Sequence, residues 1–411
     1  LLGAGVGILI QKIVTKNDAN AVLSDEWKKL IAFPGTIWLS ALKLLVLPLI
    51  SLMMIILPSR VANFGRIAKT ALPFYVFTSI CACIQGSVWV NIIQPGTIYA
   101  GEVDVDADFE PSSLADATEM DTILGIFARA VPSNIIEAMS KIQILGVIVF
   151  FFCYGLLLRN VNPKDRETVL SFSRALLKCT MVAVTWVVWL TPIGMFSMVC
   201  SKIVKTKKFF GLFKALGMYI VTVVVGQGGH LFIVLPIIVL VIARINPYKY
   251  FIKIFPAALF AFATSSSAAT LPKSIQVAEE ANVERSIYSF VLPLGAAINM
   301  DGTAQGFPIM IGFISQLYNR DVPFGSQIGV MILSILISIG TAPIPNAGMV
   351  YLVMLLEVAG MKDIEAEAMS ILLILDWLVD RIETVVNVTS DQYITKMVDK
   401  IEKKRNEDTF K

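Results

Sequence analysis

Sixteen residues near the end of the chain, DWLVDRIETVVNVTSD (376–391), carry a row of oxygen-bearing side chains within apolar sequence. A helix turns by about 100° per residue, so residues spaced four, four, three and four apart share one face. Carboxylate, amide and hydroxyl oxygens can coordinate a cation or hold an ammonium group, so the stripe predicts a binding site. Its members are Asp376, Asp380, Thr384, Asn387 and Asp391, with Glu383 at the border.

Three further polar interruptions precede this stripe. ATSSSAATLP (263–272) has apolar flanks too short to cross a membrane twice, which predicts the tip of a re-entrant hairpin. GAAINMDGTAQG (295–306) predicts an unwound break in a helix. SIGTAPIPNAG (338–348) contains two prolines, which lack an amide hydrogen and release nearby carbonyls, so it predicts a second hairpin tip.

The composition of the chain indicates the environment of the helices that position these residues. Of the 411 residues, 56% are hydrophobic and only 16% are charged, and the mean hydropathy is +0.74, which indicates an integral membrane protein. The chain opens with the half-length apolar stretch LLGAGVGILIQK, which we interpret as a span whose N-terminal part is missing rather than as a signal peptide. The predicted spans are 36–58, 70–93, 142–158, 174–200, 212–243, 287–312, 325–356 and 366–390.

Charged residues are distributed unevenly between the apolar runs. Segment 101–121 holds eight acidic residues and no basic one, whereas 159–166, 243–253 and 400–405 are basic and are predicted to face the cytoplasm. Segment 201–214 is also basic and disagrees with that orientation.

The four polar breaks together favour a transporter. Two hairpins, a broken helix and a polar-striped helix are the parts from which transporters build a site at the middle of the membrane. There, released carbonyls coordinate cations and helix N-termini hold carboxylates. The alternative, that these groups only join helices, explains one polar residue better than four clustered breaks.

At these residues the chain resembles the glutamate transporter and neutral amino acid exchanger family, the dicarboxylate/amino acid:cation symporters. The likeness covers nearly the whole chain. The motifs that carry it are LKLLVLPLI (42–50), NPYKYF (246–251), SSSAATLP (265–272), NMDGT (299–303) and DxxxDRxxTxxN (376–387).

The resemblance implies an all-α integral membrane fold with eight transmembrane helices plus two re-entrant helical hairpins. It also implies a multi-pass plasma-membrane homotrimer in which a mobile transport domain moves like an elevator against a static scaffold. The implied domains are scaffold at 1–65 and 122–208, transport domain at 66–98 and 209–411, and an acidic extracellular loop at 99–121.

Coupling to sodium (Na+) is implied as well, with three candidate sites. Asn387 and Asp391 match the ligands of one site, and a third site uses backbone carbonyls at Ser338, Ile339 and Thr341. Ala297 departs from the family's threonine beside that third site, which a backbone ligand tolerates. The remaining site would be formed by Tyr75, Thr78, Ser79, Asn299 and Asp301.

An amino acid substrate is implied by a second set of matches. The family pattern assigns the α-carboxylate to the Ser267 amide and to Asn387, and the α-ammonium to Asp380 with help from Thr384. Thr303 would lie by the substrate side chain, and Ser265 and Ile344 would offer hairpin carbonyls.

Glu383 departs from this pattern. Acidic amino acid transporters have an arginine there, which binds the substrate's side-chain carboxylate, and neutral exchangers have an uncharged residue. A carboxylate would repel glutamate or aspartate by about 4 kcal/mol at 4 Å. We therefore expect a cationic or a neutral amino acid, with an unusual cationic solute or an acidic substrate less favoured. Glu383 could instead turn away from the substrate, or carry a proton.

Two more departures concern coupling and gating. Phe307 replaces the glutamate found in potassium-coupled acidic transporters, which argues against potassium exchange here. Pro343 and Asn346 replace residues common at the second hairpin tip, so gate movement is expected to differ.

Other functional classes fit less well. Asp301 and Asp380 could suggest an aspartic protease, but its glycine-x-glycine-aspartate signature is absent, so no enzyme is predicted. A substrate-gated anion channel stays an alternative to transport. No pattern for a nucleotide, nucleic acid, haem or zinc is present, and the five cysteines and His230 are interpreted as interior packing residues.

Overall fold

The computed structural model describes most of the chain as helices. The described residues are 3, 5–7, 9–10, 24–62, 65–98, 128, 130–141, 144–205, 209–340 and 347–409, and they contain no strand. The predicted acidic loop and the tip of the second predicted hairpin lie outside them. Its main helices are α2 (Asp25–Ala62), α3 (Gly65–Ile93), α5 (Ile135–Ser140), α6 (Ile144–Leu157), α7 (Pro163–Trp189), α8 (Thr191–Lys205), α9 (Phe209–Gly229), α10 (Leu235–Ala243), α11 (Pro247–Thr264), α12 (Ser267–Glu280), α13 (Arg285–Ile298), α14 (Asp301–Leu317), α15 (Phe324–Gly340), α16 (Ala347–Val358) and α17 (Glu365–Thr409).

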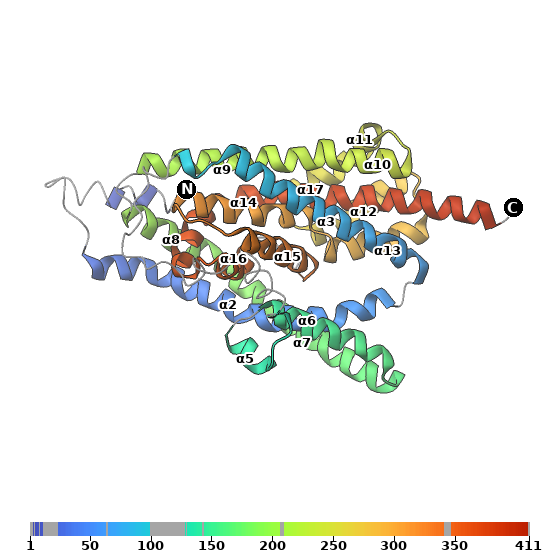
Figure 1. The fold of residues 1–411 in the computed structure, drawn as a ribbon, viewed down its shortest axis with the longest axis horizontal. Coiled ribbons are helices and arrows are strands. Elements are labelled where there is room, and N and C mark those ends of the chain that lie inside the picture. Colours follow the sequence, from blue (N-terminus) through green and yellow to red (C-terminus); the bar gives the residue numbers. More distant parts are fainter. Residues whose placement is uncertain are drawn as a thin grey trace.

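The helices form two groups (Figure 1). Helix α2 packs against α6, α7 and α8. Helices α14 and α17 form the centre of the other group, where α14 packs on α3 and α15 while α17 packs on α11, α13 and α14. The predicted domain boundaries stay a prediction.

Among the described residues, three helical stretches are long and apolar enough to cross a membrane by length and composition: 65–93, 163–187 and 211–243. The last joins α9 and α10 through a π-helical turn, η3 (His230–Val234). The predicted span 174–200 differs from the structure, because α7 ends at Trp189 and α8 begins at Thr191. Pro192 accounts for the new start, since proline is tolerated in the first turn of a helix but not inside it.

The first predicted hairpin tip falls where the sequence indicates. Helix α11 ends at Thr264, and Ser265 adopts a left-handed conformation with φ of 50°. The Ser266 hydroxyl then accepts a hydrogen bond of 3.2 Å from the Ala269 amide and caps α12. Helices α11 and α12 pack against each other, so the two serines turn the chain back on itself.

The predicted break in the NMDGT segment is also present. Helix α13 ends at Ile298, and Asn299 and Met300 are non-helical, with φ of −120° and −113°. Helix α14 begins at Asp301. The polar side chains of Asn299 and Asp301 therefore flank a gap in the helix, and the first amides of α14 have no partner within the helix.

Candidate functional site

Asp301 is the centre of a buried polar network. Its side chain is completely buried at the start of α14. The Ser79 hydroxyl of α3 donates a hydrogen bond of 2.7 Å to Oδ1, and the Ser390 hydroxyl of α17 donates to Oδ2. His230 Nε2, in the π turn, lies 3.6 Å from Oδ2. Three separate elements thus converge on one carboxylate.

Asn299 joins this network to Asp391. Its amide nitrogen donates to Asp391 Oδ1 at 2.9 Å and to Ser390 Oγ at 3.2 Å. Thr78 Oγ1 lies 3.5 Å from Asn299 Oδ1. A Cβ at Gly295 would lie 2.3 Å from Asp391 Oδ1, so only glycine leaves room for this carboxylate.

The charge of this cluster fits a cation. Asp301 and Asp391 are both buried, and in the described part of the chain no lysine or arginine forms an ion pair with either. Two buried carboxylates without a protein cation are costly unless a positive charge joins them. The surrounding hydroxyl and amide oxygens are hard donors that suit an alkali cation. Tyr75 belongs to the same face of α3, and its hydroxyl donates to the Val291 carbonyl at 2.8 Å.

Asn387 organises the first turn of α14. Its Oδ1 accepts the Gly302 amide at 2.7 Å, and its Nδ2 donates to Thr303 Oγ1 at 3.4 Å. A Cβ at Gly302 would lie 2.3 Å from the Glu383 carbonyl oxygen, which explains why α14 and α17 approach so closely here.

The hairpin serines lie at the end of α11. Ser265 and Ser267 are both buried, and Ser267 is the first residue of α12. Arg381 of α17 donates to the Phe262 and Ala263 carbonyls at 2.8 and 2.9 Å. This arginine therefore caps α11, and the partial positive charge at the N-terminus of α12 suits a carboxylate.

The remaining predicted residues lie outside the hydrogen-bond network of Asp301 that is described above. Asp380 is half-buried, and the Thr384 hydroxyl donates to the Asp380 carbonyl at 2.7 Å rather than to another helix. Ser338 and Ile339 lie at the end of α15, and the Ser338 hydroxyl donates to the Ile335 carbonyl. Thr341, Ile344, Pro343 and Asn346 lie outside the described residues.

Glu383 is buried on the other side of α14. Its side chain is 4% exposed, and Oε1 has no hydrogen-bond partner among the described residues. A Cβ at Gly306 would lie 2.0 Å from that oxygen, so the carboxylate occupies space left by this glycine. The Thr303 hydroxyl lies within hydrogen-bonding reach. Arg381 precedes Glu383 by two residues on α17, and residues two apart on a helix do not face each other. Arg381 accordingly bonds to α11.

Sequence reasoning missed several members of the site. Ser390 was not predicted, although it is adjacent to Asp391 and bonds to Asp301. His230 was interpreted as a packing residue, and it does contact Gln85 Oε1 at 3.2 Å, but it also borders Asp301. Gln227 donates to the Gly302 carbonyl at 2.8 Å. The signal available was a run of polar and small residues, GQGGH, inside an apolar span.

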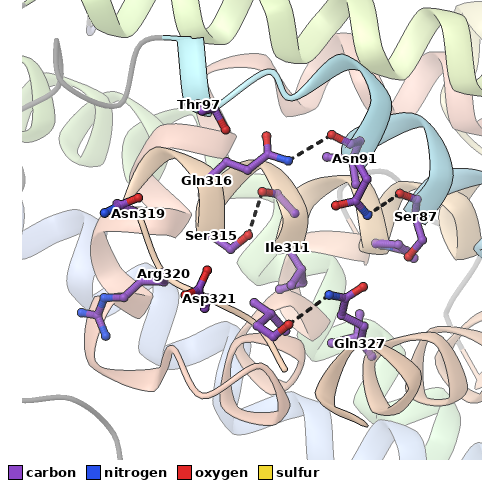
Figure 2. Close-up of a pocket in the computed structure, with 15 residues that line it drawn as sticks. Ser87, Asn91, Thr97, Ile311, Ser315, Gln316, Asn319, Arg320, Asp321 and Gln327 are labelled. Atoms are coloured by element: carbon purple, nitrogen blue, oxygen red, sulfur yellow. Dashed lines mark hydrogen bonds between the residues drawn. The ribbon is translucent and has the colours of Figure 1, made fainter. Parts of the chain in front are cut away.

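A separate cavity of about 240 Å³ lies at the far ends of α3 and α14 (Figure 2). Gln316 fixes its wall, because its amide nitrogen donates to the Val90 carbonyl at 3.0 Å and its oxygen accepts the Gly96 amide at 3.1 Å. None of the predicted site residues that the structure describes lines this cavity. Polar side chains around it include Ser87, Asn91, Thr97, Ser315, Asn319, Arg320, Asp321 and Gln327.

Comparison with known proteins places these motifs in context. The model of the "Sodium:dicarboxylate symporter family" matches residues 1–401. "Excitatory amino acid transporter 3" from Homo sapiens is 32% identical, covering 99% of this chain and 84% of the relative. "Neutral amino acid transporter B(0)" from Bos taurus is also 32% identical, covering 88% of this chain and 72% of the relative.

Proposed function

The chain belongs to the sodium:dicarboxylate symporter family, and we propose that it carries an amino acid across the membrane together with sodium by an elevator movement. Members of this family are sodium-coupled transporters. An excitatory and a neutral amino acid transporter are equally similar to this chain, so identity alone does not favour one substrate class. A homotrimer in the plasma membrane completes the proposal.

One sodium ion binds, in this proposal, among the oxygens of Thr78, Ser79, Asn299 and Asp301 near Tyr75. A second binds at Asn387 and Asp391, and a third at the carbonyls near the end of α15. The hydrogen bonds that already join α3, the α13–α14 break and α17 support the first of these sites. Because the coordinating oxygens are held in place before the ion arrives, little reorganisation of the protein is needed when sodium binds.

The amino acid lies between the first hairpin and α17. Asp380 binds the α-ammonium group, and the α-carboxylate is held by the Ser267 amide and the Asn387 side chain. Helix α12 supports this orientation, because its N-terminus carries a partial positive charge beside the hairpin turn.

The proposal for the substrate class rests on Glu383. Its buried Oε1 lacks a donor among the described residues, and such an oxygen is stabilised by a bound ammonium or guanidinium group. A substrate carboxylate there would be repelled by about 4 kcal/mol at 4 Å. The transported amino acid is therefore cationic or neutral rather than acidic.

A neutral substrate is the second candidate. The Thr303 hydroxyl lies within reach of the Glu383 carboxylate and can satisfy one of its oxygens. An uncharged side chain that donates a single hydrogen bond would then complete the pocket, or Glu383 would not contact the substrate at all.

Sodium-dependent binding to the purified protein tests these alternatives. Thermal shift would be measured with lysine, arginine, serine, alanine, glutamine, aspartate and glutamate, for the wild type and for Glu383→Arg. We expect lysine or arginine to bind the wild type and aspartate to bind the variant. The matched control is Glu357→Arg, because Glu357 lies on α16 and pairs with Lys362.

Other outcomes would change the proposal in defined ways. A preference for small neutral substrates that survives Glu383→Arg means that Glu383 does not select the substrate. Substrate-gated current without uptake in vesicles would favour the channel alternative.

A further inference from the structure

Helices α3 and α9 meet α14 beside Asp301 and Gln305. Glycines allow this close approach: a Cβ at Gly86 of α3 would lie 2.5 Å from the Gln305 carbonyl oxygen. A Cβ at Gly226 of α9 would lie 3.3 Å from Gln305 Nε2, and one at Gly229 would lie 2.7 Å from Gln85 Nε2. The amide groups of Gln85 and Gln305 therefore lie beside glycines of α9.

We call this contact the amide seam and define it by Gln85, Gln227, His230 and Gln305. Asp301 and Gln305 are four residues apart and so share one face of α14. His230 lies beside Asp301, and Gln227 donates to the carbonyl of Gly302. The seam therefore follows one face of α14 and ends at the carboxylate of the proposed sodium site.

Several polar atoms of the seam have no hydrogen-bond partner among the described residues. They are Gln227 Oε1, His230 Nε2 and both amide atoms of Gln305. All three side chains are at most 1% exposed. Each unsatisfied buried polar group is costly, so four of them along one helix face are not expected in a dry contact.

The chemistry of these atoms indicates which guest they bind. A cation needs acceptors only, but Gln305 Nε2 is a donor, and amide groups carry no net charge. Gln85 Oε1 accepts a hydrogen bond from His230 Nδ1 at 3.2 Å, and His230 Nε2 faces Asp301 Oδ2 at 3.6 Å, beyond direct hydrogen-bonding distance. Water donates two hydrogen bonds and accepts two, so it can bridge polar atoms that do not reach each other.

We infer that the amide seam binds a cluster of ordered water molecules that hydrates Asp301 on the side where His230 lies beside Oδ2. Gln85 is only partly buried, so the seam reaches the surface of the described part of the chain at this end. Gln227 and Gln305 act as positioning residues through this water. The inference rests on the proposed sodium site at Asp301.

Hydration of this kind sets how tightly sodium is held. Water stabilises the Asp301 carboxylate before sodium arrives, and that stabilisation opposes binding of the ion. Replacing Gln305 by leucine or methionine removes the amide at similar volume. We expect the sodium concentration for half-saturation to fall by about fivefold, because the sodium-free state loses hydrogen bonds.

The test combines a structure with sodium titrations. A cryo-electron microscopy map of the full-length wild type, at a resolution that shows ordered water, is expected to show density between the Gln227 and Gln305 amides. Sodium-dependent thermal shift would then be measured for wild type, Gln305→Leu and Gln305→Met. Gln316→Leu is the control, because Gln316 joins the same two helices but has both amide atoms bonded.

The outcomes separate this inference from the sodium site itself. If the amides pack against each other with no density between them, the inference is wrong, whatever the variants do. Unchanged half-saturation in both Gln305 variants also overturns it, because the seam would then be structural only. Loss of sodium dependence in Asp301→Asn, measured in parallel, shows separately that the site itself exists.

Discussion

The two sides of α14 hold buried carboxylates in opposite conditions. Asp301, at the start of α14, receives hydrogen bonds from Ser79 of α3 and Ser390 of α17 and has His230 nearby. Glu383, a residue of α17 that packs against Gly306 of α14, is also buried, but its Oε1 has no protein donor in the described part of the chain.

This difference indicates two kinds of binding. A carboxylate held by several donors is rigid and can select a small ion by geometry. A carboxylate with an unbonded oxygen depends on a guest to satisfy it, and so it selects by charge. One helix can therefore support ion coupling on one side and substrate selection on the other.

Removing the charge at Asp301 is expected to have the largest effect. Asp301→Asn leaves the shape of the network but removes the negative charge that a cation needs. We expect the sodium half-saturation concentration to rise by about 100-fold or more. Sodium titration by thermal shift measures this change, with Asp321→Asn in the far cavity as control. A sodium response like that of wild type would contradict the assignment of Asp301.

Adding a methyl group at Gly306 tests the role of Glu383. The new Cβ would lie 2.0 Å from Glu383 Oε1, so the carboxylate must move. We expect Gly306→Ala to weaken binding of a cationic substrate by about 10- to 100-fold while sodium binding in the absence of substrate stays within about twofold.

A double-mutant cycle makes this prediction specific. In a Glu383→Ala background, the same glycine substitution should change substrate binding by less than about twofold, because its collision partner is gone. Equal losses in both backgrounds would mean that Gly306 acts on the helix rather than on Glu383.

Weakening one donor to Asp301 should have a smaller effect. Ser390→Ala removes a single hydrogen bond to a charged group, for which about a tenfold rise in sodium half-saturation is expected. Ser390→Thr keeps the hydroxyl and should restore most of the affinity. If alanine and threonine behave alike, the hydroxyl of Ser390 is not part of the site.

Asp399 is a third buried carboxylate and serves as a reference for the other two. Its replacement is expected to have the smallest effect of the changes proposed. Burial acts to raise its pKa, but hydrogen bonds from Lys403, the Glu284 amide and Lys396 outweigh this and hold the pKa below the ordinary value of 3.8. A carboxylate whose pKa is lower in the folded state than in the unfolded state stabilises the fold at pH values above its unfolded-state pKa. This stabilisation is lost as the pH falls through the folded-state pKa.

Melting temperatures of wild type and Asp399→Asn should therefore differ at pH 6 and converge as pH falls below about 4. Asp321→Asn, which changes an exposed carboxylate, serves as the control. A difference that stays constant down to pH 3 would show that the ion pairs of Asp399 do not stabilise the fold.

Much of the fold was predictable because its signals are local. Serines 265–267 and the NMDGT motif interrupt apolar sequence, and the structure turns or breaks the helix at both places. The contact between Glu383 and Gly306 was not predictable, because the residues lie 77 positions apart and glycine carries no side chain to indicate a partner. Ser390 was missed for a related reason, since a serine gives no sign of which carboxylate it will meet.

The π turn at 230–234 has a consequence for the outer surface of the same helix. Counting at 3.6 residues per turn from exposed Val221 and Val225, the lipid-facing positions would continue at Leu235 and Val239, but both are buried. Ile237 and Val241 are exposed instead, because the extra residue of a π turn advances the helical phase. One inserted residue thus changes which side of α10 is exposed relative to α9, and deleting it would rotate α10 out of phase.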